Sequence, residues 1–208
     1  TNSYRGRYLV YYGVNTDCEV SNSLKNTTDD KARLSNYNTN VNNGQMNTSN
    51  NAWAKFYEGI ERANIAIRGL REYGDVENDP RMAQILGEVL TLRAVVYSDL
   101  IKGWGDVPAR FEPINSETMY LPRADRDVIY KQLLADLEEA ADLVGWPNEN
   151  WATKSSERVN KAFVKGLRAR LALAAGGYAQ RADGIRRSND PELAPDKMYT
   201  IAKNECLD

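Results

Sequence analysis

Two amphipathic segments between residues 53 and 101 constrain the fold of this chain more than any other feature. In the first, apolar residues return every three or four positions: Trp53, Phe56, Tyr57, Ile60, Ala63, Ile67 and Leu70. The second repeats this spacing with Ile85, Leu86, Val89, Leu92, Val96, Tyr97, Leu100 and Ile101. Such spacing places each set on one face of an α-helix. Asp79-Pro80 predicts the start of the second helix, so the pair forms an αα-hairpin with facing apolar sides.

Two further helices are predicted after a linker over residues 109–124. Asp125 and Asn160 are the expected N-cap residues, because their side-chain oxygens can accept from the free N–H groups of a first turn. The inward faces are predicted to carry Val128, Ile129, Leu133, Leu137, Ala140, Ala141 and Val144 in the first helix. The inward face of the second helix is predicted to carry Phe163, Val164, Leu167, Leu171, Ala174 and Ala175.

The two ends of the chain are also predicted to be helical, over residues 3–14 and from about Asp196 onward. No segment shows the alternation typical of a strand, so we expect an all-α fold. Helical hairpins in series are typical of tetratricopeptide-like stacks. Helix starts near residues 52, 81, 125 and 160 lie 29, 44 and 35 residues apart, so the predicted repeat is irregular.

Asparagine dominates residues 15–51, which lie between the first helix and the hairpin. Asparagine side chains bond to nearby backbone groups and tolerate left-handed conformations, so this composition predicts a long polar loop. Loops much longer than roughly six residues are usually functional or disordered. We therefore expect residues 1–208 to form one helical domain, truncated at both ends. Its polar loop spans 15–51 and its helical-hairpin core spans 52–182.

Composition excludes several functional classes. The 208 residues contain no histidine, which rules out Ser-His-Asp and Cys-His catalysis. The net charge of −2 argues against a nucleic-acid-binding protein, and no apolar run approaches the roughly 20 residues of a membrane span. Cys18 and Cys206 lack the spacing of a metal or redox site. Adjacent carboxylates such as Glu138-Glu139 diverge on a helix and are read as surface charges. We expect no enzyme, metal or cofactor.

Several motifs occur in a fixed order. Residues 53–64 read W-x-x-x-Y-x-x-I-x-R-x-N, and residues 87–97 read G-E-x-x-x-L-R-A-x-x-Y. Residues 104–108 read W-G-D-V-P, and the helix over residues 162–175 follows. In type and order, this set resembles the SusD/RagB family of nutrient-binding outer-membrane lipoproteins. The resemblance covers about residues 53–177.

This resemblance implies a helical protein that binds oligosaccharide without cleaving it, or peptide in RagB-like members. Such proteins sit on the cell surface as outer-membrane lipoproteins, anchored through a lipid on an N-terminal cysteine. They cover a SusC-like TonB-dependent transporter. Family members are considerably longer, and neither the anchor cysteine nor the second half is present in this sequence. A helical-repeat scaffold whose only partner is protein remains the alternative.

The ligand-binding residues are expected in the Asn-rich loop, since sugars need aromatic faces together with planar amides or carboxylates. The candidates are Asp17, Arg33, Tyr37, Asn38 and Asn40. In starch-binding members, an acidic residue and an aromatic-plus-Asn pair contribute glycan contacts at similar places, and Tyr37 is the lone aromatic between residues 15 and 51. An equally open reading makes these residues caps of turns in a solvated loop.

Polar residues on the hairpin helices are given structural roles instead. Asn64 lies at helical spacing with the apolar stripe, where its amide can hold an interhelix turn. Arg93 is expected to form a buried or half-buried polar link between helices, with Glu88 as its partner.

Overall fold

The computed structural model describes residues 14, 16–19, 28–46, 52–155 and 157–208. The helix predicted over residues 3–14 therefore lies outside the described residues, apart from Val14. The chain divides into two compact units, Thr1–Gly59 and Ile60–Asp208, and each is described by itself. Most of the described residues are helical, which confirms the all-α class.

In the first unit, part of the predicted loop is helical. Helix α2 spans Asp30–Ser35, where the Asp29 side chain accepts from the Lys31 N–H and caps the first turn. Its own residues Ala32 and Leu34 are buried. The many flanking asparagines hide this short helix, because one buried turn leaves no long periodic pattern.

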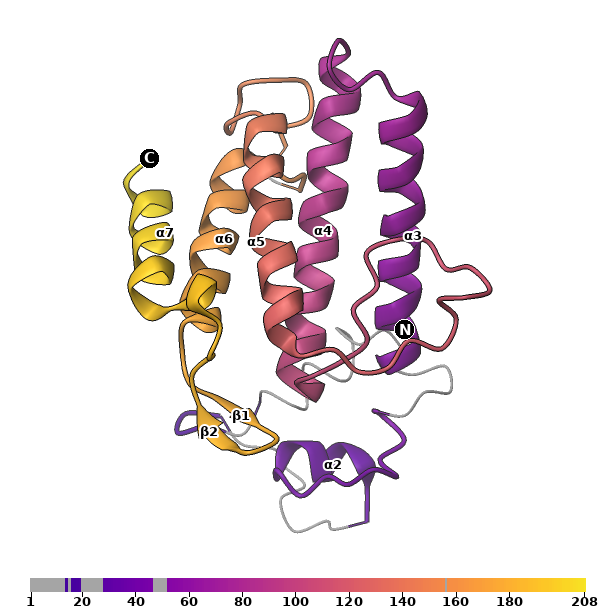
Figure 1. Cartoon of the computed structure of the whole chain (residues 1–208), viewed down its shortest axis with the longest axis vertical. Helices are drawn as coiled ribbons and strands as arrows, with labels where there is room; N and C mark the ends of the chain where they lie inside the picture. The colour runs from indigo at the N-terminus through magenta and orange to yellow at the C-terminus, as the bar shows by residue number, and fades with distance from the viewer. Residues whose placement is uncertain (1–13, 15, 20–27, 47–51, 156) are drawn as a thin grey trace. The chain divides into compact units, whose positions relative to one another are not determined.

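The second unit is a row of helices that follow the order of the chain (Figure 1). Helix α3 spans Ala52–Tyr73 and enters this unit at Ile60. Helices α4 (Pro80–Trp104), α5 (Arg126–Leu143), α6 (Lys161–Ala175) and α7 (Pro195–Leu207) then pack in succession, each against the next. This serial packing agrees with the predicted arrangement of helical hairpins.

The three predicted N-caps are confirmed. The Asp79 side chain accepts from two N–H groups at the start of α4, Asp125 accepts from the Asp127 N–H, and Asn160 accepts from the Phe163 N–H. Each of these bonds satisfies a first-turn donor that has no partner within its own helix. The helix starts are therefore set by local side-chain chemistry.

The predicted core faces are correct in most positions and wrong in four. Leu92, Val128 and Phe163 are 53%, 50% and 48% exposed, and Ala174 is exposed too, although the apolar spacing predicts all four to face inward. Each lies one helical step of about 100° from a residue that takes the inward position, and the neighbours Ile129 and Val164 are fully buried. An apolar residue at the margin of a stripe can thus face outward.

A small β-hairpin interrupts the helices, contrary to the expectation of no strand. Strand β1 (Ala179–Arg181) pairs antiparallel with β2 (Gly184–Arg186), and a 3₁₀ turn follows at Pro191–Leu193. Three-residue strands are too short to show an alternating pattern, so they cannot be predicted from apolar spacing. No helix in the described ranges is long and apolar enough to cross a membrane.

The W-G-D-V-P motif ends α4 in a turn that requires glycine. Gly105 has a φ of 72°, and a Cβ at this position would lie 2.4 Å from Nη2 of Arg126. The next residue, Asp106, accepts a 2.8 Å bond from Nε of Arg126 at the start of α5. The motif therefore connects the C-terminal end of α4 to the N-terminal end of α5.

Helices α6 and α7 are joined by an ion-pair network centred on Glu205. Its side chain is 7% exposed and accepts from Nζ of Lys165 at 2.6 Å and from Nη1 of Arg168. Arg168 also reaches back to α5, where its Nε donates to the Leu134 carbonyl at 3.1 Å. One arginine thus ties three consecutive helices together.

This network predicts a loss of stability in acid. Burial pushes the pKa of Glu205 upward, but the hydrogen bonds from Lys165 and Arg168 outweigh burial and leave its pKa below the ordinary 4.5. Folding therefore favours the ionised carboxylate, whose contribution is complete above the unfolded pKa and is lost as pH falls through the folded one. Without histidine, we expect the urea midpoint to be flat between about pH 5 and 8 and to fall below about pH 4.

The variant Glu205→Gln identifies the source of this dependence. It should lower the urea midpoint at neutral pH and flatten the decline in acid, because glutamine keeps the shape but not the titratable charge. Glu117→Gln, at an exposed carboxylate of the linker, should change neither. Equal acid sensitivity in Glu205→Gln and the wild-type chain would contradict the assignment.

Candidate functional site

The Asn-rich segment places Tyr37 directly after helix α2 in a left-handed conformation. The Asn38 N–H donates to the Arg33 carbonyl at 3.0 Å, and the Tyr37 N–H donates to the Leu34 carbonyl at 3.3 Å. This pair of bonds is the Schellman motif, whose left-handed position is usually glycine. Tyr37 occupies it with a φ of 53°. A bulky residue there costs about 1–2 kcal/mol, so the backbone that carries the Tyr37 ring is strained.

The segment after Tyr37 is closed back onto the start of α2. Nδ2 of Asn43, which is fully buried, donates to the Asp30 carbonyl at 2.9 Å. The Gly44 N–H donates to Oδ2 of Asp30 at 2.7 Å. Both ends of this loop are therefore anchored on one helix, and its tip protrudes.

The tip carries the chemistry expected of a sugar site. The Tyr37 side chain is 64% exposed, and Asn38 and Asn40 are exposed beside it. The Asn40 side-chain oxygen accepts from the Asn42 N–H at 3.0 Å, so it caps a turn as the alternative reading proposed. Its amide nitrogen and the whole Asn38 amide have no partner among the described residues. An aromatic face and amide donors are thus presented together.

The five predicted site residues are brought together only in part. Arg33 lies in the last turn of α2 and is bonded through its carbonyl to Asn38, whereas its Nε is buried without a hydrogen-bond partner. Asp17 is exposed in a bend at residues 16–18, and its carboxylate accepts from Sγ of Cys18 at 3.5 Å. No described interaction joins Asp17 to Tyr37. The assignment of all five to a ligand site stays a prediction.

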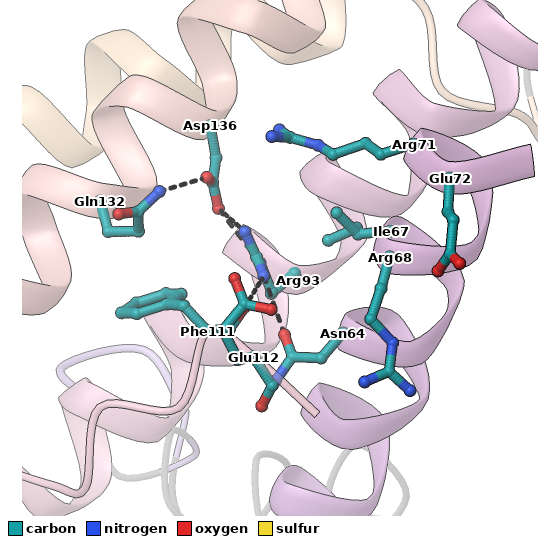
Figure 2. A pocket seen from close by; sticks show the side chains of 10 residues that line it. All are labelled: Asn64, Ile67, Arg68, Arg71, Glu72, Arg93, Phe111, Glu112, Gln132 and Asp136. Atoms are coloured by element: carbon teal, nitrogen blue, oxygen red, sulfur yellow. Dashed lines mark hydrogen bonds and ion pairs between the residues drawn. The ribbon is translucent and has the colours of Figure 1, made fainter. Parts of the chain in front are cut away.

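A buried polar network in the second unit explains the polar residues of the hairpin helices (Figure 2). Arg93 of α4 is 4% exposed at its side chain and pairs with Asp136 of α5 at 2.7 Å. Its Nη1 donates to Oδ1 of Asn64 at 2.8 Å and to the Phe111 carbonyl at 3.0 Å. The structural role predicted for Arg93 is correct.

The predicted partner of Arg93 is wrong. Glu88 instead pairs with Arg158 at 2.7 Å and accepts from the Gln84 amide at 3.0 Å. Glu88 and Arg93 are five residues apart on α4, and a five-residue step turns the side chain by about 500°, well away from the same face. Sequence inspection missed Asp136 as the partner, although it stands at an inward position of a helix where an unpaired carboxylate would be costly.

Glu138 and Glu139, which the sequence predicts to be surface charges, each form an ion pair. Glu138 pairs with Arg168 at 2.9 Å, and Glu139 pairs with Arg71 at 2.6 Å. Both cysteines are free thiols. Across the described parts of the chain, no group of three or more cysteine, aspartate or glutamate residues could hold a metal ion.

Comparison with known proteins gives a consistent result. A SusD-like family model, described as "Starch-binding associating with outer membrane", matches residues 8–173, which is 166 of the 208 residues. The SusD-like protein P38 of Formosa agariphila is 36% identical over 90 residues, covering 42% of this chain and 17% of that protein. The chain thus spans a small fraction of the length of its relative.

Solved structures agree on the fold. A laminarin-binding SusD-like protein has a TM-score of 0.59 and 25% identity, with 70% of this chain and 30% of that chain covered. A SusD superfamily protein from Parabacteroides distasonis has a TM-score of 0.68 and 21% identity, over 96% of this chain and 37% of that chain. On the strength of the family match, the chain belongs to the SusD-like family.

Proposed function

We propose that this chain is part of a cell-surface nutrient-binding protein that captures oligosaccharide without cleaving it. Membership of a family described as starch-binding supports a carbohydrate ligand, as does the likeness to a laminarin-binding protein. The observation that carries the proposal is Tyr37, an exposed ring held at a positive φ between amide side chains. Strained, exposed residues of this kind cluster at ligand sites.

The proposed mechanism is stacking followed by hydrogen bonding. The face of the Tyr37 ring covers the apolar face of a sugar ring, and the Asn38 and Asn40 amides bond to its hydroxyl groups. The captured glycan then passes to a SusC-like TonB-dependent transporter. The whole protein is anchored by a lipid to the outer membrane that contains this transporter. This hand-off predicts that the whole protein co-purifies with such a barrel in mild detergent, and its purification alone would contradict the hand-off.

The capture step is tested by calorimetric titration with a maltooligosaccharide, a laminarioligosaccharide and a short peptide. Tyr37→Gly is the sharpest variant, because glycine suits a φ of 53° and leaves the Schellman bonds in place while it removes the ring. We expect saccharide affinity to fall by at least about tenfold, as for an aromatic residue at the centre of an interface. The variant should be as stable as the wild-type chain or slightly more so.

Tyr120→Ala is the matched control, since Tyr120 is 90% exposed and lies in the linker before α5. It should leave the affinity unchanged. Unchanged saccharide affinity in Tyr37→Gly would show that the segment carrying Tyr37, Asn38 and Asn40 is not the saccharide-binding site. Binding of the peptide alone would favour the RagB-like alternative over glycan capture.

A further inference from the structure

A cavity lies in the unit formed by residues 60–208. It encloses about 380 Å³ and is bounded by α3, α4, α5 and the segment that follows α4 (Figure 2). This volume lies near the lower end of the roughly 300–1,000 Å³ typical of small-molecule pockets. The cavity therefore suits one ring-sized ligand better than a long oligomer. None of its lining residues belongs to the Tyr37 segment.

The floor of the cavity is rigid. It is formed by the buried Arg93–Asp136 pair and by Asn64, whose hydrogen bonds leave little freedom to move. Nδ2 of Asn64 donates to the carbonyl oxygens of Arg110 and Glu112, both at 3.1 Å. These bonds fix the backbone that carries the Glu112 side chain, so a group at the rim is positioned by a network beneath it.

The rim, in contrast, offers polar groups with unused hydrogen-bonding capacity among the described residues. Among the residues described, the Arg68 guanidinium has no ion pair and the Glu112 carboxylate has no hydrogen bond. Gln132 donates through Nε2 to Asp136 at 2.8 Å, which leaves its oxygen available. All three groups are planar and border the same cavity, with Ile67 as an apolar wall (Figure 2). Together they supply donors, acceptors and one apolar contact.

The charges around the cavity cancel. The lining contains three arginines and three carboxylates, so the formal charges sum to zero: Arg68, Arg71 and Arg93 against Glu72, Glu112 and Asp136. A site for phosphate or for an acidic sugar would be expected to carry an excess of positive charge. Balanced charge with free donors and acceptors favours an uncharged ligand rich in hydroxyl groups.

We infer that this cavity is a second carbohydrate site, which takes a single neutral hexose unit through Arg68, Glu112 and Gln132. Arg68 donates to sugar oxygens, and Glu112 and the Gln132 oxygen accept from hydroxyl groups. This inference goes beyond capture by the Tyr37 segment, and it stands or fails separately from it.

The test follows the arginine Nε–Hε resonances of the ¹⁵N-labelled chain during separate titrations with D-glucose, D-galactose and D-mannose, and with D-glucuronic acid and free leucine as contrasting ligands. We expect the Arg68 resonance to shift and saturate with at least one hexose. Arg170, exposed on α6, should stay unchanged. Arg68→Ala and Glu112→Gln should each weaken that binding by at least about tenfold, the effect of losing a hydrogen bond to a charged group. In Arg68→Ala, which lacks the Arg68 signal, binding is followed at the Arg71 resonance, because Arg71 also lines the cavity.

Matched controls are Arg170→Ala and Glu117→Gln, which remove the same charges away from the cavity, and circular dichroism confirms that each variant is folded. Binding that is retained in Tyr37→Gly and lost in Arg68→Ala supports the second site even where the proposed capture fails. Three results overturn it: no saturating shift with any hexose, a response to glucuronic acid alone, or a response to free leucine alone.

Discussion

Replacing Asp136 by alanine is expected to lower the free energy of unfolding by about 3–5 kcal/mol, the cost of breaking a buried ion pair. The reason is that the Arg93 side chain is only 4% exposed and forms its ion pair with Asp136, at 2.7 Å. Without that carboxylate the guanidinium stays buried with no compensating charge. Gln132 also loses the acceptor of its 2.8 Å bond.

Urea denaturation of the wild-type and variant chains measures this effect. Glu139→Ala is the matched control, because it also removes a carboxylate of α5 that pairs with an arginine, but both partners are about half exposed. Its loss should stay below about 1 kcal/mol. If Asp136→Ala and Glu139→Ala lowered the free energy of unfolding by similar amounts, burial of the Arg93–Asp136 pair would not explain the effect.

A double variant separates the net stabilisation by the ion pair from the penalty of breaking it. Arg93→Met combined with Asp136→Leu removes both charges and fills much of the volume, so it should be less destabilised than Asp136→Ala alone.

The cost of leaving a buried charge unpaired also explains why the floor and rim of the cavity need different experiments. A floor variant tests folding, whereas Arg68 and Glu112 at the rim can be changed without uncovering a buried charge.

Local chemistry made much of this fold predictable from sequence. Asp79, Asp125 and Asn160 each cap the helix that follows them, as their residue types indicated. Capping depends on residues within one turn, and so do the apolar stripes that mark the helices. These features need no knowledge of tertiary structure.

Features set by distant residues were not predictable in the same way. The partner of Arg93 lies 43 residues away on another helix, and only the packing of α4 on α5 selects Asp136 over Glu88. Packing likewise decides that Leu92 faces outward. The aromatic residue of the Asn-rich segment could be named from sequence, but its positive φ could not, because left-handed tyrosine is rare.

Gly87 shows how a single residue of a family motif controls helix packing. It is buried in α4, and a Cβ there would lie 2.5 Å from Cγ1 of Val144 and 3.1 Å from Cβ of Leu143. The Ala140 carbonyl oxygen would be 3.2 Å away. Val144 is 2% exposed and has a short branched side chain, so it cannot swing aside. Glycine is what allows α4 and α5 to approach at this point.

Gly87→Val is therefore expected to destabilise the chain by about 3 kcal/mol, because the added methyl groups force the two helices apart. Alanine at the same position should also destabilise, although it gains up to about 1 kcal/mol of helix propensity. Gly166 of α6 provides the control, since a Cβ there would meet nothing within 4 Å. Gly166→Ala should stabilise by about 0.5–1 kcal/mol in the same urea assay. The decisive outcome is that Gly87→Ala lowers the free energy of unfolding while Gly166→Ala raises it. If both variants raised it, the close approach of α4 and α5 at Gly87 would be contradicted.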